Sequence, residues 1–377
     1  MDAETLGARR PIPVRHSKTM TLTSRVALAA WLGPWAGSLV PGGVTREAHR
    51  LEGERTMSVY VYRGAREPHG IYVVTPGMHF LGPDDPRLDR FCRVLARAGF
   101  VVVAPLLPDF LSLAVAPTTT DDLAMAFDFA ADRAERESLP APMLFSISFG
   151  SQPAIALAAR EGYRDRLGAL LLFGGYADFE SVVRFSVTGR VAHAGKVHAL
   201  PRDPLNSPVV FMNLLPFLDT EADRDVVRGA WREMVEQTWG KMELKEGRAR
   251  EPFARAIAAK LAPKEKVLFL AGCGLHPSAP ERLEEGLEGA GDAFAFADPR
   301  PDLARIRAPI TLVHGRDDDV IPFFEAEKLA AALPPGHPHE VLLTGMYGHT
   351  GTALPKPKDI AAELKTMLRV VSSLART

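Results

Sequence analysis

Cysteine is almost absent from this chain, since Cys92 and Cys273 are the only two among 377 residues. Two thiols cannot supply a disulfide framework or a cysteine-rich metal centre. Cys92 falls on the apolar stripe of an expected helix, where a thiol packs as a small buried hydrophobe. The histidines outside the strand ends show no spacing typical of metal ligands either. We therefore expect no metal site.

The chain also lacks a charge excess and any run of basic residues. Its formal net charge is −1, which gives no electrostatic reason to expect nucleic acid as a partner. Residues are 46% hydrophobic and 24% charged, a composition typical of a soluble globular protein with a sizeable core. No apolar stretch is long enough to span a bilayer.

The N-terminal extension, residues 1–43, combines a basic segment with a short apolar run at 26–32. This order resembles the charged and apolar regions of a secretory signal. Pro34 interrupts the pattern, however, and no small-residue cleavage site stands in the expected place. A docking helix, contact with a membrane surface through residues 20–40 and a cleaved signal all stay open. Cytoplasmic localisation is the expectation, with export or peripheral membrane association as alternatives.

Strand and helix patterns alternate along much of the chain. Residues 57–62 alternate between apolar and polar, which predicts an exposed or edge strand, whereas the continuous apolar run at 70–75 predicts a covered parallel strand. Further strands and amphipathic helices are expected at 88–95, 100–104, 123–130, 143–147, 167–173, 308–315, 324–333, 340–344 and 359–374. This rhythm predicts an α/β protein with a doubly wound, mostly parallel sheet. Ligands of such sheets gather at the carboxyl ends of the strands.

The alternation breaks between residues 181 and 299, where helical patterns occur without strands. We interpret 44–180 together with 300–377 as the α/β core, and 181–299 as a mainly helical cap or lid inserted over the strand ends. Trp231 and Trp239 in this insertion could line an apolar pocket, although a small core belonging to the cap itself is the favoured interpretation.

The segment from Ser146 to Gly150 carries the clearest chemical signal. A strand pattern ends there and a helix pattern begins at once, with Ser148 at the turn. A nucleophilic serine needs such a sharp turn, because its hydroxyl must project free of the neighbouring backbone. The flanking positions must be small, since strand and helix nearly touch, and Ser146 and Gly150 meet that requirement as structural residues of the elbow.

A serine hydroxyl also needs a base, which in turn needs an orienting acid. Asp318 follows the expected strand at 308–315, and His349 follows the last strand after a short loop that contains glycine. Asp317 and Asp319 flank Asp318 and are alternative acids.

Together these segments resemble the α/β-hydrolase superfamily over roughly 55–180 and 300–377. Nucleophile, acid and histidine stand in the family's order, and His-Gly-x-x-Asp at 314–318 is similar to its acid loop. The resemblance implies Ser148 as nucleophile, His349 as general base and acid, and Asp318 as orienting carboxylate. Asp178 occupies the acid position that some members use instead. The insertion is similar in position to the cap found between the family's sixth and seventh strands.

The same resemblance implies an oxyanion hole formed by the backbone N–H groups of Met78 and Phe149. Pro76-Gly77 stands where the family often has His-Gly, and this departure leaves the N–H of Met78 available. His79 follows the turn and is a candidate pocket residue, with a surface position as the alternative.

The sequence therefore predicts a serine hydrolase, specifically a carboxylesterase or lipase-like enzyme. It would cleave a small-molecule ester, a thioester or an amide with an apolar acid or alcohol, through an acyl-enzyme on Ser148 and without a cofactor. Two alternatives stay open. An acyltransferase would use the same triad, and a non-catalytic binding protein would keep the fold without aligning the residues.

Overall fold

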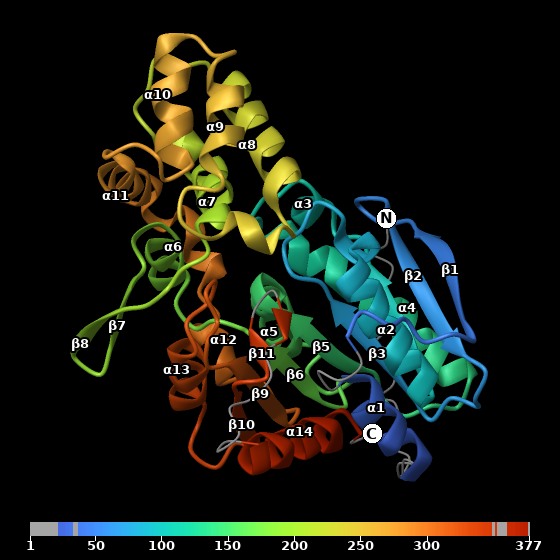
Figure 1. Ribbon diagram of the computed structural model, residues 1–377. Helices are drawn as coiled ribbons and strands as arrows, with labels where there is room; N and C mark the ends of the chain where they lie inside the picture. The colour runs from blue at the N-terminus through green and yellow to red at the C-terminus, as the bar shows by residue number, and fades with distance from the viewer. Residues whose placement is uncertain (1–21, 33–36, 349–350, 353–359, 376–377) are drawn as a thin grey trace, which may run out of the picture.

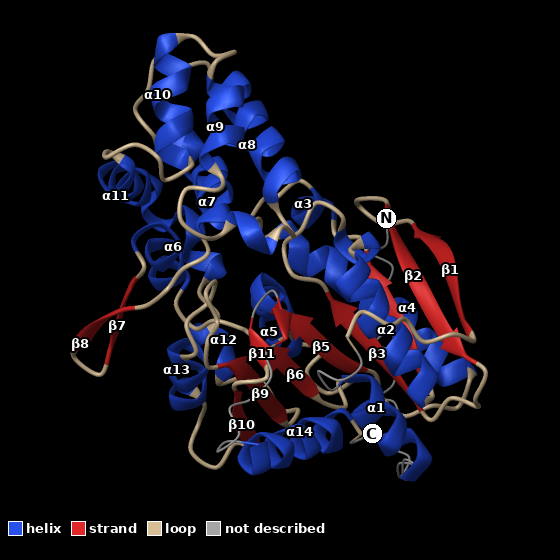
Figure 2. Ribbon diagram, in the orientation of Figure 1, coloured by secondary structure: helices blue, strands red, loops and turns tan. Residues whose placement is uncertain are grey.

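The computed structural model describes residues 22–32, 37–348, 351–352 and 360–375. Within these residues eight strands form one sheet in the order β1-β2-β4-β3-β5-β6-β9-β10 (Figures 1 and 2). β1 and β2 pair antiparallel, as do β2 and β4, whereas every pair from β4 to β10 is parallel. The predicted fold class, a doubly wound and mostly parallel sheet, is confirmed. The strands are β1 Val44–Leu51, β2 Met57–Gly64, β3 Gly70–Thr75, β4 Phe100–Pro105, β5 Met143–Ile147, β6 Leu170–Phe173, β9 Ile310–Gly315 and β10 His339–Thr344.

The prediction of an edge strand at 57–62 is wrong. β2 is paired on both sides, and the edge is formed by β1, which the sequence did not indicate. β1 has a mostly exposed burial pattern and carries charged residues along its length. A solvated edge strand of this kind has almost no apolar signal, because only its end residues, Val44 and Leu51, pack against the core.

Helices cover both faces of the sheet because its central strands are apolar on both sides. Every residue of β3 is buried, with Ile71 and Val73 in the core on one face and Tyr72 and Val74 in the core on the other. The first face packs against α4 Thr118–Arg136, α5 Ser151–Ala159, α12 Arg300–Leu303 and α13 Phe324–Ala332. The second packs against α1 Leu22–Leu32, α2 Pro86–Ala98 and α14 Ile360–Leu374.

The boundaries of α2 follow from local chemistry. Asp85 precedes the helix and accepts a hydrogen bond from the N–H of Arg87, while Pro86 occupies the first turn, where no N–H is needed. Gly99 ends the helix with φ +103°, a left-handed conformation that glycine adopts without steric penalty.

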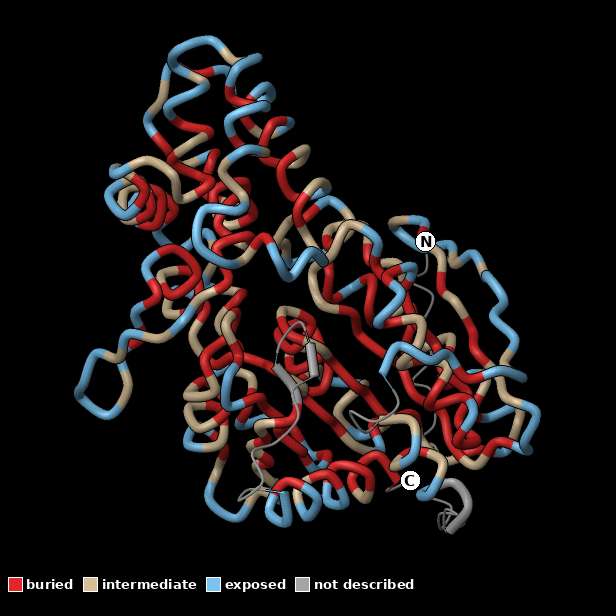
Figure 3. Tube along the Cα trace, viewed as in Figure 1, coloured by how far each residue is buried: buried red, intermediate tan, exposed pale blue. Residues whose placement is uncertain are grey.

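The mainly helical insertion between β6 and β9 forms the upper part of the molecule in Figure 1. It has an apolar core of its own, seen as buried segments in Figure 3. Trp231 is fully buried there and its indole N–H donates to the carbonyl of Phe269 at 3.0 Å. The insertion holds α6 Phe179–Thr188, α7 Ser207–Leu214, α8 Arg224–Thr238, α9 Glu251–Ala258, α10 Pro263–Gly272, α11 Ala279–Ala290 and a hairpin of β7 Arg190–His193 and β8 Lys196–Ala199. Outside it lie the short α3 Pro108–Leu111 and a small pair of strands, β11 Tyr347–Gly348 and β12 Gly351–Thr352.

Part of the N-terminal segment is helical. Of the residues proposed for membrane contact, 22–32 form α1, which packs against α2 and α14, and Leu28 is fully buried in that interface. Val26 faces solvent with 58% of its surface exposed. No helix in the described ranges combines the length and the apolar character needed to cross a membrane.

Candidate active site

Ser148 lies at the turn between β5 and α5, at the start of a short 3-10 turn, Ser148–Gly150. Its φ is +53°, in the left-handed region that residues other than glycine seldom adopt. Such strain persists only where the surrounding structure imposes it, and it is concentrated at functional sites. Ser148 is buried, with 5% of its surface exposed. This is the geometry that a nucleophile elbow requires.

The segment from Thr75 to Gly77 passes directly beside this turn. A Cβ on Gly150 would overlap the carbonyl oxygen of Pro76, and a Cβ on Gly77 would lie 3.3 Å from the Cβ of Ser148. Both glycines are therefore needed for the close approach of the two backbones. This approach brings the turn that contains Met78 next to the nucleophile candidate.

Met78 and Phe149 both lie between the core of the sheet and the core of the cap. Both side chains are partly buried and pack against the core of the sheet and against the core of the cap. The ring of Phe149 lies 5.3 Å from that of Tyr176, centroid to centroid, and Tyr176 is fully buried in the cap-side cluster. The two residues proposed as oxyanion donors thus sit where the two apolar cores meet.

Asp318 follows β9 at the same edge of the sheet as Ser148, because β5, β6 and β9 are parallel neighbours. Its side chain is buried, and Oδ1 accepts hydrogen bonds from the N–H groups of Val320 and Ile321 at 2.9 and 2.8 Å. These bonds fix the carboxylate in the loop that follows the strand. His314 in β9 contacts the second carboxylate oxygen: its Nε2 lies 3.4 Å from Asp318 Oδ2 and 2.8 Å from the carbonyl oxygen of Ile321.

The three consecutive acids have different environments. Asp317 is exposed, whereas Asp319 Oδ2 accepts from Lys245 Nζ at 2.7 Å. Burial raises the pKa of Asp319 above its ordinary value, and the ammonium group of Lys245 opposes that rise. Lys245 also lies 2.8 Å from Asp203 Oδ2, so one cap lysine bridges a cap carboxylate and the acid loop.

Asp178, the alternative acid, has a local role at the start of α6. Its Oδ1 accepts from the N–H of Ser181 at 3.0 Å and thereby caps the helix. Its Oδ2 lies 3.7 Å from Arg300 Nη1. Asp178 lines a cavity of about 500 Å³ between α6, the hairpin and the segment before α12.

His79 follows Met78, in the turn proposed to supply an oxyanion donor (the oxyanion turn, Pro76–Met78), and is mostly buried. Its Nδ1 accepts from the N–H of Leu81 at 3.1 Å, and its ring stacks on Phe80 and lies 5.3 Å from the ring of Trp239 in the cap. Burial lowers the pKa of His79 to about 4, even though the Asp85 carboxylate favours protonation. His79 therefore lies as a neutral ring between the oxyanion turn and the cap.

His349, the proposed base, lies outside the described residues. Ser146 is fully buried, and its hydroxyl has no hydrogen-bond partner in the described part of the chain. Among these residues no group of three or more His, Cys, Asp and Glu side chains is placed to hold a metal ion.

Sequence reasoning missed three contacts of this region: the bridge by Lys245, the contact between the rings of Trp239 and His79, and the contact between His314 and Asp318. The first two join segments that are far apart in sequence and have no pattern of their own. The third had a signal, because His314 directly precedes Gly315 in the acid-loop motif.

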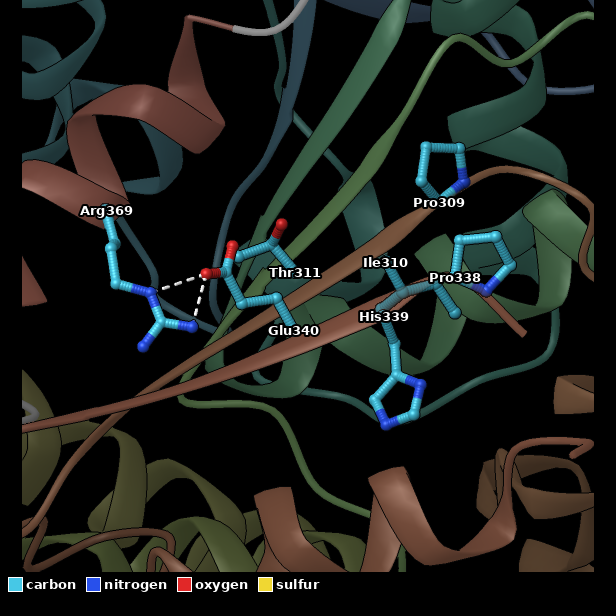
Figure 4. Close-up of a pocket in the computed structure, with 7 residues that line it drawn as sticks. All are labelled: Pro309, Ile310, Thr311, Pro338, His339, Glu340 and Arg369. Carbon is cyan, nitrogen blue, oxygen red and sulfur yellow. Dashed lines mark hydrogen bonds and ion pairs between the residues drawn. The ribbon is translucent and has the colours of Figure 1, made fainter. Parts of the chain in front are cut away.

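A pocket of about 340 Å³ lies elsewhere, at the amino ends of β9 and β10 (Figure 4). Pro309 and Pro338 stand at its rim, and Arg369 of α14 binds Glu340 Oε1 at 2.7 Å. Ser148 and Asp318 follow the carboxyl ends of their strands, so this pocket opens at the opposite edge of the sheet.

A scan against models of known protein families finds no match to the chain. Among solved structures, a variant of the esterase Est22 superposes with a TM-score of 0.50 at 12% identity, over 94% of this chain and 86% of that one. Brefeldin A esterase, described as a bacterial homologue of human hormone sensitive lipase, gives 0.47 at 16% identity over 97% and 88% of the two chains. The acylaminoacyl peptidase of Pyrococcus horikoshii gives 0.45 at 11% identity over 89% of this chain, which spans 41% of that peptidase.

At these identities the likeness concerns the arrangement of helices and strands. The superposition on the Est22 variant covers most of both chains, and the sheet is mostly parallel with helices on both faces. The chain has the α/β-hydrolase fold.

Proposed function

We propose that this protein is a serine hydrolase that cleaves carboxylic esters through an acyl-enzyme on Ser148. The observation that carries the proposal is the left-handed backbone of Ser148, held in an enclosed turn against Gly77. Strain at Ser148, between β5 and a helix and at the carboxyl edge of the sheet, has a direct chemical use in nucleophilic catalysis.

In the proposed mechanism the Ser148 hydroxyl attacks the ester carbonyl while His349 accepts its proton. The negative charge on the tetrahedral intermediate is stabilised by the N–H groups of Met78 and Phe149. His349 then protonates the leaving alcohol, and water repeats the two steps to release the acid. Asp318 orients the histidine, and its own hydrogen bonds from two backbone N–H groups hold its carboxylate in place.

The surroundings favour an apolar substrate. Half-buried apolar side chains gather where the oxyanion turn and the nucleophile turn meet the cap, and they include Met78, Phe80, Val115, Phe149 and Trp239. Apolar surface that is covered only in part gains free energy when a ligand completes its burial. An ester with an aliphatic or aromatic acyl group fits these walls better than a charged one.

The experiment is labelling of the intact protein with a small fluorophosphonate ester, followed by peptide mass spectrometry. A single adduct on Ser148 is the expected result, and the Ser148→Ala variant should carry none. Ser151 is the matched control. It lies three residues after Ser148, and its hydroxyl accepts a hydrogen bond from the N–H of Tyr176. Ser151→Ala should still be labelled on Ser148. An unlabelled wild-type protein would favour a non-catalytic binding protein on this fold.

Hydrolysis and acyl transfer share every step up to the acyl-enzyme. The two activities are separated by the products formed from an activated ester with and without an added acceptor alcohol. Free acid in both reactions supports the hydrolase, whereas a new ester formed in preference to free acid would identify an acyltransferase.

A further inference from the structure

Exposed apolar side chains gather on α1, on the loop that follows it and on α14. More than half of the large apolar residues that are exposed in the described part of the chain lie on these segments, with 42% to 67% of the surface of each exposed: Val26, Leu39, Val40, Ile360, Leu364 and Leu368. We call these six residues the α1–α14 face. Single exposed apolar residues are common on proteins, whereas a group of them on adjoining elements is typical of a contact surface.

The three segments adjoin one another in the fold. α1 packs directly against α14 (Figure 1). The guanidinium of Arg90 in α2 joins α1 to the loop, since it donates to the carbonyl oxygens of Trp31 at 2.7 Å and of Leu39 at 2.8 Å. The three exposed apolar residues of α14 recur every four positions, so they form one row along the helix.

This row lies on the side of α14 that is turned toward α1 and α2. On another side of the helix, Arg369 Nη2 and Ser373 Oγ bind the carboxylate of Glu340 at 2.7 and 3.1 Å, and Glu340 belongs to β10, the edge strand of the sheet. Since 3.6 residues make one helical turn, Leu364 and Leu368 point away from that pair by roughly 140° around the helix axis. α2 covers β2 and β4 toward the other end of the sheet, and α1 packs against both helices. The row therefore continues toward α1 and away from the sheet edge.

The exposed charges of these segments are all positive. α1 and the loop 37–43 contain no acidic residue, and Arg25 is exposed. The only acid of α14 is Glu363, which is buried and accepts hydrogen bonds from Thr344 Oγ1 and from the N–H of Gly345. Lys365 is exposed beside the leucine row. Residues 1–20, which precede α1 in the chain, contain more basic than acidic residues: Arg9, Arg10, Arg15 and Lys18 against Asp2 and Glu4.

We propose that the α1–α14 face docks the protein on an anionic membrane surface. Apolar residues flanked by basic ones suit the interface of a bilayer, because the apolar side chains enter the boundary with the acyl chains while the basic ones bind anionic headgroups. The contact is peripheral, since the other sides of α1 and α14 are packed in the core. A second copy of the chain is a poorer occupant, because a two-fold contact would bring Arg25 and Lys365 against a surface of their own sign.

A membrane bound at this face would leave the cap accessible. In Figure 1 α1 and α14 lie at the bottom of the molecule and the insertion forms its top. The segments that carry the proposed catalytic groups contact the insertion, so they lie away from the docked surface. The proposal does not rest on the proposed function, because docking requires no hydrolysis.

Flotation of the intact protein with sealed vesicles measures the docking. Wild type should bind vesicles of phosphatidylcholine mixed with phosphatidylserine, and at least about tenfold more weakly vesicles of phosphatidylcholine alone, because basic side chains are attracted only by the anionic surface. Leu364→Ser/Leu368→Ser should bind the anionic vesicles at least about tenfold more weakly than wild type, since two apolar side chains no longer enter the interface. Lys365→Glu should weaken this binding by about tenfold as well, because an attraction becomes a repulsion.

The matched controls carry the same kinds of change in the cap. Val226→Ser/Val267→Ser replaces two apolar residues of α8 and α10 that are exposed to a similar degree, and Lys266→Glu reverses the charge of an exposed lysine of α10. Both controls should bind the anionic vesicles as wild type does. Thermal unfolding of all four variants should resemble that of wild type, since every replaced side chain is exposed. If the leucine variant does not fold, Lys365→Glu compared with Lys266→Glu decides the question.

Absence of wild-type binding to the anionic vesicles would overturn the proposal, as would undiminished binding by the leucine variant. Sedimentation velocity without lipid tests the competing occupant. A wild-type dimer that Leu364→Ser/Leu368→Ser converts to a monomer would assign the face to a second copy of the chain and would also overturn the proposal. A wild-type monomer that binds the anionic vesicles through the leucine row is the expected result.

Discussion

Replacing Gly150 with alanine tests whether the contact between the nucleophile turn and the oxyanion turn organises the site. The φ of Gly150 is −62°, so alanine introduces no backbone strain of its own. The added Cβ would overlap the carbonyl oxygen of Pro76 and lie 3.1 Å from that of Thr75. Neither obstacle is a side chain that can rotate away, so one of the two backbones must move.

The size of the effect has two parts. Overpacking of a close contact destabilises a protein by about 1–3 kcal/mol, and a backbone neighbour places this change at the upper end. To restore ordinary contact, the carbonyl of Pro76 must move away by about 1 Å, and Gly77 and Met78 must move with it because they follow Pro76 directly in the chain. A displacement of about 1 Å in a catalytic group reduces the rate roughly 100-fold. We therefore expect kcat to fall about 100-fold in protein that is still folded.

The matched control is Gly64→Ala, because a Cβ on Gly64 would likewise overlap a backbone carbonyl oxygen, that of Ala96. Gly64 ends β2 near the amino end of β4, at the edge of the sheet opposite Ser148. Urea unfolding should show similar destabilisation of both variants, by about 1–3 kcal/mol. Ester hydrolysis per folded molecule should fall only in Gly150→Ala. Equal kcat in the two variants would show that the close approach does not position the oxyanion donors.

Three further predictions concern strain and protonation. Ser148→Gly and Ser148→Ala should both be inactive, yet the glycine variant should be more stable by roughly 0.5–1 kcal/mol in thermal unfolding, because glycine adopts the positive φ freely. Burial raises the pKa of Asp122 to about 6 against the opposing charge of Arg55, so wild type loses stability as the pH rises from about 4 through 6; Asp122→Asn should remove roughly 2–3 kcal/mol of that dependence, measured by urea unfolding at pH 4.5 and 7.5. The rate of hydrolysis should rise with pH around a midpoint of roughly 6–7, as His349 loses its proton. A rate that does not change between about pH 5 and 9 would refute a histidine base. His79→Gln should leave that midpoint in place, since the pKa of His79 is about 4 and its ring is already neutral there; a displaced midpoint would assign the titration to His79 instead.

The sheet was predictable wherever its strands are covered on both faces. The run at 70–75 matches β3 in both bounds, and the run at 100–104 is one residue shorter than β4, because continuous apolar runs of this length fit only a buried strand. β1 and the β7–β8 hairpin left no such signal, since their burial patterns are mostly exposed. Their strand character comes from pairing with a neighbour, which a single sequence does not display.

At the site, the turn around Ser148 was predictable because its requirements are local. Small residues two before and two after a serine, with a strand pattern before and a helix pattern after, describe the turn almost completely. The function of Gly150 was predictable only in kind, because its partner Pro76 is more than 70 residues away in sequence. The position of Lys245 depends on how the cap folds, and no local pattern marks it.

Three contacts join the cap to segments of the core near Ser148, Met78 and Asp318. Gln152 of α5 donates to the carbonyl of Phe296 at 2.8 Å, which fastens the nucleophile helix to the end of the insertion. The ring of Trp239 packs against that of His79, the residue after Met78, and so connects the cap to the proposed oxyanion turn. Lys245 binds Asp319, which fastens the acid loop.

Each of these three contacts therefore joins the cap to a different segment that carries a proposed catalytic group. Rigid displacement of the whole insertion would break all three contacts at once, including the partly buried ion pair between Lys245 and Asp319. The insertion therefore contacts each of the three segments that carry Ser148, Met78 and Asp318, and a change in its position would move all three together.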